Sequence, residues 1–296
     1  MNIFLTGATG FIGLAVTAEL IRAGHRVTGL ARSDKGEQLL ARIGADTHRG
    51  ALENLQSLVD GAQKADAVIH CAYDHSFSQP EEETAKKETQ AIEALGRGLQ
   101  GTSRPLIITS VAAMGRAASG QLATEDFYDS ATRNPRKSTE LAGARVADSG
   151  VNVSVVRLPQ VHNECKQGFV TELIAFAREK GVSAYVGEGA NQWAAAHLLD
   201  VAALYRLVVE QSQSGLRYHA VAEEGIPLRD IAQAISVGLS VPLVSLSSEA
   251  ANDHFGWLAM FAQMDMRASS AQTRQRVGWH PSHSGLLADL ARYFSL

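Results

Sequence analysis

The chain has 296 residues, of which 45% are hydrophobic and 20% are charged, the profile of a soluble globular protein with a full core. Its formal net charge is -4 at pH 7, which argues against a surface that binds nucleic acids or anionic membranes. Cys71 and Cys165 are the only cysteines, too few for a disulfide framework or a zinc ribbon, so we expect two reduced, buried thiols.

The N-terminal segment MNIFLTGATG has no charged region and no long apolar run, unlike a signal peptide. No segment approaches the ~18 uninterrupted apolar residues of a membrane-spanning helix. These two observations predict a cytoplasmic protein with no membrane partner.

Short apolar runs alternate with amphipathic stretches through the first half of the chain, and this alternation predicts strands and helices in turn. The predicted elements are, in chain order, a strand at 2–6, a helix at 11–24, a strand at 26–31, a helix at 34–44, a strand at 65–72, a helix at 81–99, a strand at 104–110, a helix at 136–148 and a strand at 151–159. Asp34 is a possible N-cap of the second helix, and Gly44 is a possible residue of its C-terminal turn.

Strands that are almost continuously apolar, each followed by a helix, are typical of a parallel sheet covered on both faces. Because such crossovers are right-handed, they predict an α/β fold of the Rossmann type, a doubly wound parallel sheet with helices on both faces. We assign this dinucleotide-binding domain to residues 1–160.

The pattern loosens after Pro159, and we assign residues 161–296 to a smaller, mostly helical substrate-binding region that is partly interleaved with the sheet. We expect this region to lie over the carboxyl edge of the sheet. Its predicted elements are a helix at 168–181, a short strand at 183–187, a helix that starts near Asp200 and ends at 212, a strand at 217–222, a helix at 227–239, a strand at 242–247 and a mostly helical tail.

The segment TGATGFIG places three glycines between the first strand and the first helix. One glycine permits the sharp turn, another lets the backbone approach a diphosphate, and the third lets helix and strand pack closely. The helix N-terminus then presents free N–H groups to the anion. The residues expected to contact a dinucleotide are Thr6, Gly7, Gly10, Phe11, Ile12 and Gly13, together with Ala72 after the strand at 65–72.

The end of the second strand reads LARSDK, and it bears on the type of nicotinamide cofactor. An acidic residue there would hold a ribose 2′-hydroxyl, whereas Arg32, with Ser33 and Lys35 nearby, suits a 2′-phosphate. Asp34 comes later and is explained by helix capping. We therefore favour NADP(H) as the cofactor, with NAD(H) also possible.

Four segments together resemble a known family: TGATGFIG, ADAVIHCA, LIITSVAAMG and VSVVRLPQVHN. They look like the extended branch of the short-chain dehydrogenase/reductases, the epimerase/dehydratase-like group. The likeness covers essentially the whole chain and is strongest up to Asn163. The segment HLLDVAALYRLVVE also looks like a helix of those proteins.

The resemblance implies a catalytic set of a tyrosine, a lysine four residues later, a serine or threonine on an earlier strand and an asparagine on the long middle helix. The tyrosine needs the nearby cation because a free phenol has a pKa of ~10. Ser110 matches the serine, and the asparagine position aligns with Glu88. The tyrosine position reads Arg136 and the lysine position reads Glu140, so the chain lacks the Tyr-x-x-x-Lys pair, as in atypical subgroups of the family.

Two other residues are candidates for the proton donor. Tyr73, followed by Asp74 and His75, leaves the carboxyl end of a strand, where open α/β sheets bind their ligands. His162 follows the strand at 151–159 and has an ordinary pKa of ~6.5. A polar loop with one buried aromatic, and a histidine in a pocket wall, are the alternative interpretations. Tyr128 has no lysine at the matching spacing.

The predicted role of the charged segment TRNPRKSTELAG is therefore structural. Arg136 begins a helix and Glu140 lies one turn on, so we expect the two to form an ion pair. His197 and Asp200 are expected to orient the substrate region or to cap a helix.

Aromatic side chains in the second half have two interpretations. Trp193, Trp257 and Phe261 either line an apolar pocket or pack in the core. The histidines lack a His-x-x-x-His or His-x-x-Glu pattern with suitable company, so we expect no metal.

Two functions remain open. The first is an NAD(P)H-dependent oxidoreductase or epimerase-like enzyme that acts on a small, partly apolar carbonyl or alcohol substrate, with Ser110, Tyr73 and His162 as its non-standard catalytic residues. The alternative is a non-catalytic NADP(H)-binding sensor or regulatory protein. Relatives often dimerise through the helices at 81–99 and 136–148, which implies a possible homodimer.

Overall fold

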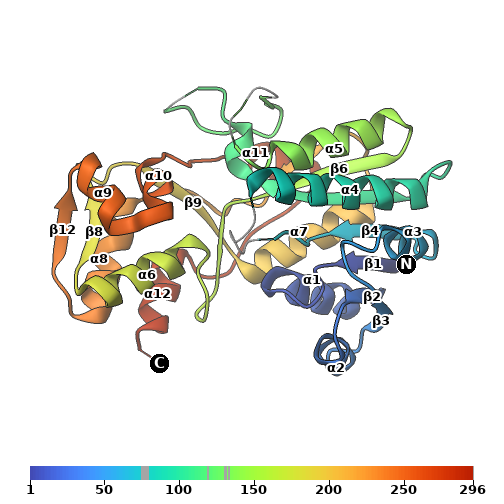
Figure 1. Cartoon of the computed structure of the whole chain (residues 1–296), viewed down its shortest axis with the longest axis horizontal. Helices are drawn as coiled ribbons and strands as arrows, with labels where there is room; N and C mark the ends of the chain where they lie inside the picture. Colours follow the sequence, from blue (N-terminus) through green and yellow to red (C-terminus); the bar gives the residue numbers. More distant parts are fainter. Residues whose placement is uncertain (75–79, 119, 130–131, 133, 296) are drawn as a thin grey trace.

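The computed structural model describes residues 1–74, 80–118, 120–129, 132 and 134–295 (Figure 1). Its centre is a seven-stranded sheet in the order β10-β6-β5-β4-β1-β2-β3, and every neighbouring pair is parallel. The predicted doubly wound parallel sheet is therefore confirmed. The strands are β1 (Asn2–Thr6), β2 (Arg26–Ala31), β3 (Asp46–Arg49), β4 (Ala67–His70), β5 (Pro105–Val111), β6 (Asn152–Leu158) and β10 (Arg217–His219).

Helices cover both faces of this sheet because alternate strand residues point to opposite sides. Ile3 and Leu5 pack with α1, α2 and α7, whereas Phe4, between them, packs with α3, α4 and α5. Figure 1 shows these two helical layers on either side of the strands. The helices are α1 (Phe11–Arg22), α2 (Asp34–Arg42), α3 (Leu55–Gln63), α4 (Glu81–Leu99), α5 (Lys137–Asp148) and α7 (Leu198–Gln211), with a 3-10 turn η1 (Ala112–Gly115) after β5 and α11 (Ala271–Val277) beside β10.

The remaining elements form a smaller unit at the other end of the molecule (Figure 1). It contains a three-stranded sheet, β11-β9-β7, and a two-stranded sheet, β12-β8, which pack with helices around an apolar core of their own. The elements are β7 (Gln160–His162), β8 (Ser183–Val186), β9 (Gln192–His197), β11 (Glu223–Pro227), β12 (Leu243–Leu246), α6 (Phe169–Lys180), α8 (Leu228–Leu239), α9 (Ser248–Phe255), η2 (Gly256–Leu258), α10 (Ala259–Gln263) and α12 (Leu286–Tyr293).

The chain crosses between the two units more than once. After leaving the large sheet at Leu158, it returns to pack α7 against α1 and to add β10 beside β6. Within the described residues, no helix has both the length and the apolar character needed to cross a lipid bilayer.

The sequence pattern did not predict several of the strands. β3 reads DTHR and is an edge strand with three exposed residues, so its backbone pairing with β2, rather than apolar side chains, defines it. β9 reads QWAAAH, and its alanines carry no strong strand preference, although five of its six residues are buried. The short strands β7 and β11 pair with β9 and are stabilised by that pairing.

Two local predictions at helix starts need correction. Ser33, not Asp34, caps α2, because its side chain accepts a hydrogen bond from the backbone N–H of Gly36. Asp34 lies in the first turn and accepts a hydrogen bond from Arg49 at 2.8 Å. The helix expected to start near Asp200 begins at Leu198.

The turn between β1 and α1 depends on close backbone contacts. Gly7 has a φ of +73°, a conformation that favours glycine. A side chain on Gly13 would place its Cβ atom 2.0 Å from the carbonyl oxygen of Gly7, so helix and turn meet backbone to backbone. This contact holds the start of α1 against the carboxyl end of β1.

Gly13→Ala should lower the free energy of unfolding by about 1–3 kcal/mol, because the new methyl group must displace backbone. Alanine within a helix is ordinarily more stable than glycine by about 1 kcal/mol. A decrease in the free energy of unfolding would therefore come from the close contact with Gly7. Urea unfolding measures this free energy. Gly10→Ala is the control, since a Cβ atom on Gly10 would come no closer than 3.2 Å to the carbonyl oxygen of Gly7. Equal unfolding midpoints for wild type and Gly13→Ala would contradict the expectation.

Candidate nucleotide and carbonyl site

The start of α1 has the features of an anion site. Its N-cap is Gly10, with no side chain to bond the first N–H groups, and no acidic residue lies in the first turn. The backbone N–H groups at Phe11 and Ile12 and the positive end of the helix dipole therefore favour a negatively charged ligand. The backbone of Ala72 closes the other side, because a Cβ atom on Gly7 would lie 2.6 Å from its nitrogen. A dinucleotide diphosphate fits these residues.

The other residues predicted to bind the cofactor have different settings. The hydroxyl of Thr6 is buried and bonds to Nδ1 of His70 at 2.6 Å, so its side chain is occupied within the protein. Arg32 is exposed at the end of β2, where its charge contributes to lowering the pKa of Glu53 after the larger effect of Lys87. Ser33 is exposed and bonds Gly36.

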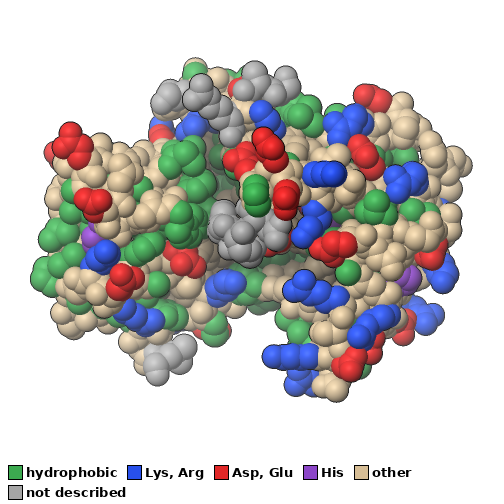
Figure 2. Space-filling view, viewed as in Figure 1, with side chains coloured by type: hydrophobic (Ala, Val, Ile, Leu, Met, Phe, Trp, Pro, Cys, Tyr) green, Lys and Arg blue, Asp and Glu red, His purple; other side chains and the backbone are tan. Residues whose placement is uncertain are grey.

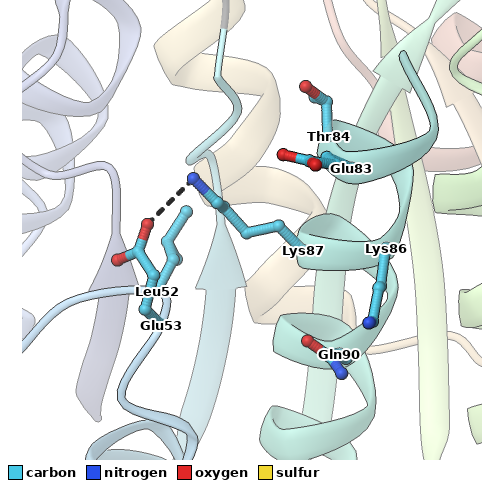
Figure 3. A pocket seen from close by; sticks show the side chains of 7 residues that line it. All are labelled: Leu52, Glu53, Glu83, Thr84, Lys86, Lys87 and Gln90. Atoms are coloured by element: carbon cyan, nitrogen blue, oxygen red, sulfur yellow. Dashed lines mark ion pairs between the residues drawn. The ribbon is translucent and has the colours of Figure 1, made fainter. Parts of the chain in front are cut away.

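A cleft lies between α4 and the loop that follows β3. Figure 3 shows the side chain of Lys87 reaching from α4 to Glu53, with an Nζ–Oε1 distance of 2.9 Å. Lys87 also lies 3.7 Å from Asp74, just after β4. The cleft is lined by Leu52, Glu53, Glu83, Thr84, Lys86, Lys87 and Gln90.

Arg136 lies at the carboxyl edge of the sheet. Its guanidinium is 3.7 Å from the ring centroid of Tyr73, and Nη2 donates a hydrogen bond to the carbonyl oxygen of Thr109 at the end of β5. Nη2 is also 3.8 Å from Oε1 of Glu88. Nε is buried and has no hydrogen-bond partner among the described residues. Arg136 therefore brings a cation to Tyr73, which the sequence pattern had not indicated.

Behind Arg136, Glu88 is held in a buried network. It accepts hydrogen bonds from Thr139 at 3.0 Å and from Nε2 of His70 at 3.3 Å. Burial acts to raise the pKa of Glu88, but the nearby His70 and Arg136 outweigh it, and the pKa is lowered. Glu88 is therefore an anion that balances the charge of Arg136.

The predicted ion pair between Arg136 and Glu140 is wrong. Glu140 instead forms two hydrogen bonds with Arg157 on β6, at 2.8 and 2.9 Å, and a third with Arg217 on β10 at 3.0 Å. Burial acts to raise the pKa of Glu140, but Arg157 outweighs it and lowers the pKa. The two side chains diverge because Arg136 faces the sheet edge, whereas Glu140 faces the strands β6 and β10.

Two hydroxyl groups lie near this ion pair. Ser110 is 1% exposed, and its Oγ makes no hydrogen bond of ordinary geometry within the described residues. The hydroxyl is nevertheless close enough to Glu140 to help lower the pKa of that carboxyl group, after the larger effect of Arg157. The hydroxyl of Tyr128 is also buried without a partner there, and the guanidinium of Arg217 lies 5.0 Å from its ring centroid. Burial raises the pKa of Tyr128.

Tyr73 and Ser110 belong to neighbouring parts of the site, because Arg136 contacts the ring of Tyr73 and bonds the residue before Ser110. Burial is the main cause of a raised pKa for Tyr73. The phenol is thus protonated at neutral pH. His75 lies outside the described residues.

His162 lies in a different group of residues. It is fully buried, and its Nδ1 bonds Asp289 on α12 at 2.7 Å, while Nε2 has no hydrogen-bond partner among the described residues. Burial lowers the pKa of His162. The ring of His197 packs edge-to-face against the ring of His162, with 5.7 Å between the ring centroids. The ring of His197 also stacks on the ring of His283, with 4.8 Å between the centroids. The contacts of His162 are therefore separate from those of Tyr73, which lies against Arg136.

His197 and Asp200 stabilise the start of α7. His197 is its N-cap and accepts a hydrogen bond from the backbone N–H of Leu199. Asp200 accepts hydrogen bonds from the backbone N–H groups of Ser282 and His283. The predicted capping role is confirmed for His197.

Ligand atoms of Glu164, His197 and Asp289 lie within 4.8 Å of one another, a spacing that a metal ion could use. However, Nδ1 of His197 already accepts a backbone hydrogen bond. The Asp289 oxygens already bond His162 and Ser284. His197 and Asp289 are thus held in place by hydrogen bonds within the protein, and Nε2 of His197 lies 3.7 Å from Oδ2 of Asp289.

The predicted aromatic residues gather around Phe169 at the start of α6. Its ring centroid is 4.8 Å from that of Phe261, 5.8 Å from that of Trp257 and 6.4 Å from that of Trp193. Trp193 is fully buried, whereas Trp257 is 44% exposed, so the cluster runs from core to surface. In Figure 2, hydrophobic side chains line one wall of the central hollow, over α10, opposite the charged side chains over α4.

The comparisons with known proteins agree with this architecture. A family model described as the NAD dependent epimerase/dehydratase family matches residues 3–222. An uncharacterized protein of Schizosaccharomyces pombe is 45% identical over 292 residues, which are 98% of each chain. A sterol-4-alpha-carboxylate 3-dehydrogenase (decarboxylating) of Dictyostelium discoideum is 26% identical over 77% of this chain and 73% of its own.

A solved structure with the same fold contains a nicotinamide cofactor. The human epimerase family protein SDR39U1, crystallised with NADPH, superposes with a TM-score of 0.74 at 18% identity. The match covers 100% of this chain and 99% of that one. At this identity the likeness concerns the fold.

A pH-dependent stability follows from His219 on β10. Its Nδ1 bonds the carbonyl oxygen of Ser269 at 2.8 Å, and Nη1 of Arg157 lies 3.3 Å from its Nε2. Burial, with the charge of Arg157, lowers the pKa of His219 to about 3. The unfolded chain binds this proton below pH ~6.5 and the folded chain does not, so the free energy of unfolding should fall by about 1.4 kcal/mol per pH unit from this group as pH decreases from 6.5 toward 3.

His219→Gln should remove this dependence, since an amide keeps one donor and one acceptor but does not titrate. Urea unfolding between pH 7 and pH 5 should show a shallower pH dependence for the variant than for wild type. The exposed His280→Gln is the control and should retain the wild-type slope. Parallel slopes for His219→Gln and wild type would overturn the assignment.

Proposed function

Because the chain belongs to the NAD dependent epimerase/dehydratase family, we propose that it is an NADP(H)-dependent reductase that acts on the carbonyl group of a small, partly apolar substrate. The observation that carries this proposal is the placement of Tyr73, Arg136 and Ser110 at the carboxyl ends of β4 and β5. In an open parallel sheet, that edge is where ligands bind.

The cofactor would lie along this edge. Its diphosphate would meet the N-terminus of α1, and its 2′-phosphate would meet Arg32, whose planar guanidinium can bond two phosphate oxygens at once. When bound, the nicotinamide supplies a hydride to the substrate carbonyl carbon.

The protein then has two tasks at the carbonyl oxygen. Ser110 would donate a hydrogen bond from its hydroxyl, which lies near the Glu140 carboxylate but makes no hydrogen bond of ordinary geometry among the described residues. Tyr73 would give its phenolic proton to the same oxygen as the carbonyl becomes an alcohol, and would recover a proton from solvent. The raised pKa of Tyr73 keeps the phenol protonated until the more basic alkoxide forms.

We favour Tyr73 over His162 as the proton donor because of its surroundings. Tyr73 is half-buried, whereas His162 is fully buried and already bonds Asp289. The cation of Arg136 against the Tyr73 ring would stabilise the phenolate that is left after proton transfer. Arg136 thereby supplies the positive charge that the missing lysine gives in relatives.

The aromatic cluster supports an apolar substrate. Phe169, Trp257 and Phe261 form an aromatic cluster in the smaller unit, at the start of α6, in η2 and in α10. A hydrophobic wall with few polar groups is typical of sites for small organic ligands. The Dictyostelium relative is named a sterol-4-alpha-carboxylate 3-dehydrogenase, and a sterol skeleton in that name supports a partly apolar substrate here.

NADPH consumption tests the proposal directly. The purified protein should oxidise NADPH in the presence of at least one member of a panel of aliphatic and aromatic ketones and aldehydes, followed at 340 nm, with the alcohol identified as product. Tight NADPH binding without turnover across the panel would favour the sensor alternative. Failure to bind NADPH would overturn both.

Arg32→Asp should weaken NADPH binding by about tenfold or more while affecting NADH much less, because only NADPH carries the phosphate that Arg32 would contact. Fluorescence titration with both cofactors measures this ratio. Arg42→Asp, which makes the same charge change at the far end of α2, is the matched control. Equal losses for NADPH and NADH would remove the 2′-phosphate role from Arg32.

Ser110→Ala should reduce turnover about 10²-fold and leave the dissociation constant of NADPH nearly unchanged, because the lost hydrogen bond is to the substrate oxygen. Steady-state kinetics and cofactor titration separate the two quantities. Ser103→Ala, at the exposed residue two positions before β5, is the control. Wild-type turnover in Ser110→Ala would exclude the proposed role.

A further inference from the structure

The loop between β7 and α6, residues 163–168, belongs to the smaller unit but contacts the glycine-rich turn of the larger one. Nζ of Lys166 is 5.5 Å from the ring centroid of Phe11. Phe11 is the first residue of α1, next to the N-cap Gly10. In Figure 1 the loop descends between α6 and the start of α1. A lysine from the second half of the chain thus lies at the anion-binding end of α1.

The backbone of this loop is held by its own hydrogen bonds. The side-chain oxygen of Asn163 accepts from the backbone N–H groups of Cys165 and Lys166, both at 2.9 Å. The backbone N–H of Asn163 donates to the carbonyl oxygen of Lys166 at 2.9 Å, and the buried Gln167 bonds the carbonyl oxygen of Asn163. Lys166 is therefore an exposed side chain on a well-defined turn, directed toward α1.

We propose that Lys166 binds the diphosphate of the cofactor and that the loop 163–168 covers it. This inference rests on the proposed cofactor site at α1. The α1 N-terminus has no side-chain cap and no acidic residue in its first turn, so Phe11 is the group that the ammonium of Lys166 faces. A contact with a ring face is weaker than a charge-assisted hydrogen bond to a phosphate oxygen. With the diphosphate present, the ammonium moves from the ring to the phosphate.

The neighbouring Cys165 provides a chemical reporter for the same loop. Cys165 is exposed, so the expectation of a buried thiol is wrong at this position, and it is one residue from Lys166. The only other thiol, Cys71, lies against Thr109 and Tyr205, and burial raises its pKa to about 11. Because the thiolate is the reactive form, alkylation near neutral pH reports on Cys165.

The first experiment measures cofactor affinity. Lys166→Ala should raise the dissociation constant of NADPH about tenfold, and Lys166→Arg should recover most of the loss, because it restores the positive charge. The difference between Lys166→Ala and wild type should shrink as salt is increased. Lys64→Ala, an exposed lysine just before β4 at the opposite edge of the sheet, is the matched control.

Adenosine 2′-monophosphate distinguishes the diphosphate from a general attraction of anions, because it keeps the 2′-phosphate and lacks the diphosphate. Its affinity should be the same for wild type and Lys166→Ala. An equal loss for this ligand would overturn the diphosphate role. If wild type binds NADPH and Lys166→Ala binds it equally well, the inference about Lys166 fails while the proposed function stands. If wild type does not bind NADPH, the proposed function itself fails.

The second experiment follows the rate of alkylation of Cys165 by N-ethylmaleimide. Saturating NADPH should slow the reaction several-fold in the wild-type protein, whereas adenosine 2′-monophosphate should not. Cys165→Ser should remove the fast phase and so identify the thiol. An alkylation rate that saturating NADPH leaves unchanged would show that the loop does not cover the cofactor.

Discussion

The charge of Glu140 is neutralised inside the protein by Arg157 and Arg217, and the arrangement of the candidate site depends on this contact. It joins three elements, α5, β6 and β10, of which β10 comes from the second half of the chain. Removing one partner from a buried ion pair is costly, on the order of 3–5 kcal/mol, because a charge is left without compensation. The pair therefore fixes the start of α5, and Arg136 lies one turn before Glu140 on that helix.

With α5 fixed, Arg136 is held against Tyr73, Glu88 and the end of β5. Glu88 stays ionised in the interior because His70, Thr139 and Arg136 surround it. The result is a cation beside a phenol at the carboxyl edge of the sheet. This pair is what the proposed reduction of a carbonyl group would use.

The two halves of the chain also meet on the cofactor side. The glycine turn brings N–H groups and a helix dipole, but no side-chain cation, to the place where a diphosphate would lie. Lys166, whose ammonium lies 5.5 Å from the ring centroid of Phe11 at the start of α1, comes from the loop after β7. Under the functions proposed above, the smaller unit would contribute aromatic residues for the substrate and a charge for the cofactor, and the site would need both halves of the chain.

The sequence by itself determined the class of fold, most of the elements of the large sheet and the glycine turn, because burial on both faces and the 3.6-residue period leave direct marks on residue order. It did not determine the polar edge strand β3, the alanine-rich β9 or the partners of the charged residues. Arg136 and Glu140 stand four residues apart, and local spacing favoured an ion pair between them. The tertiary structure placed Arg157 and Arg217 closer to Glu140 and Tyr73 closer to Arg136. Ion pairs and proton donors are chosen by distance in space, which only the packed chain decides.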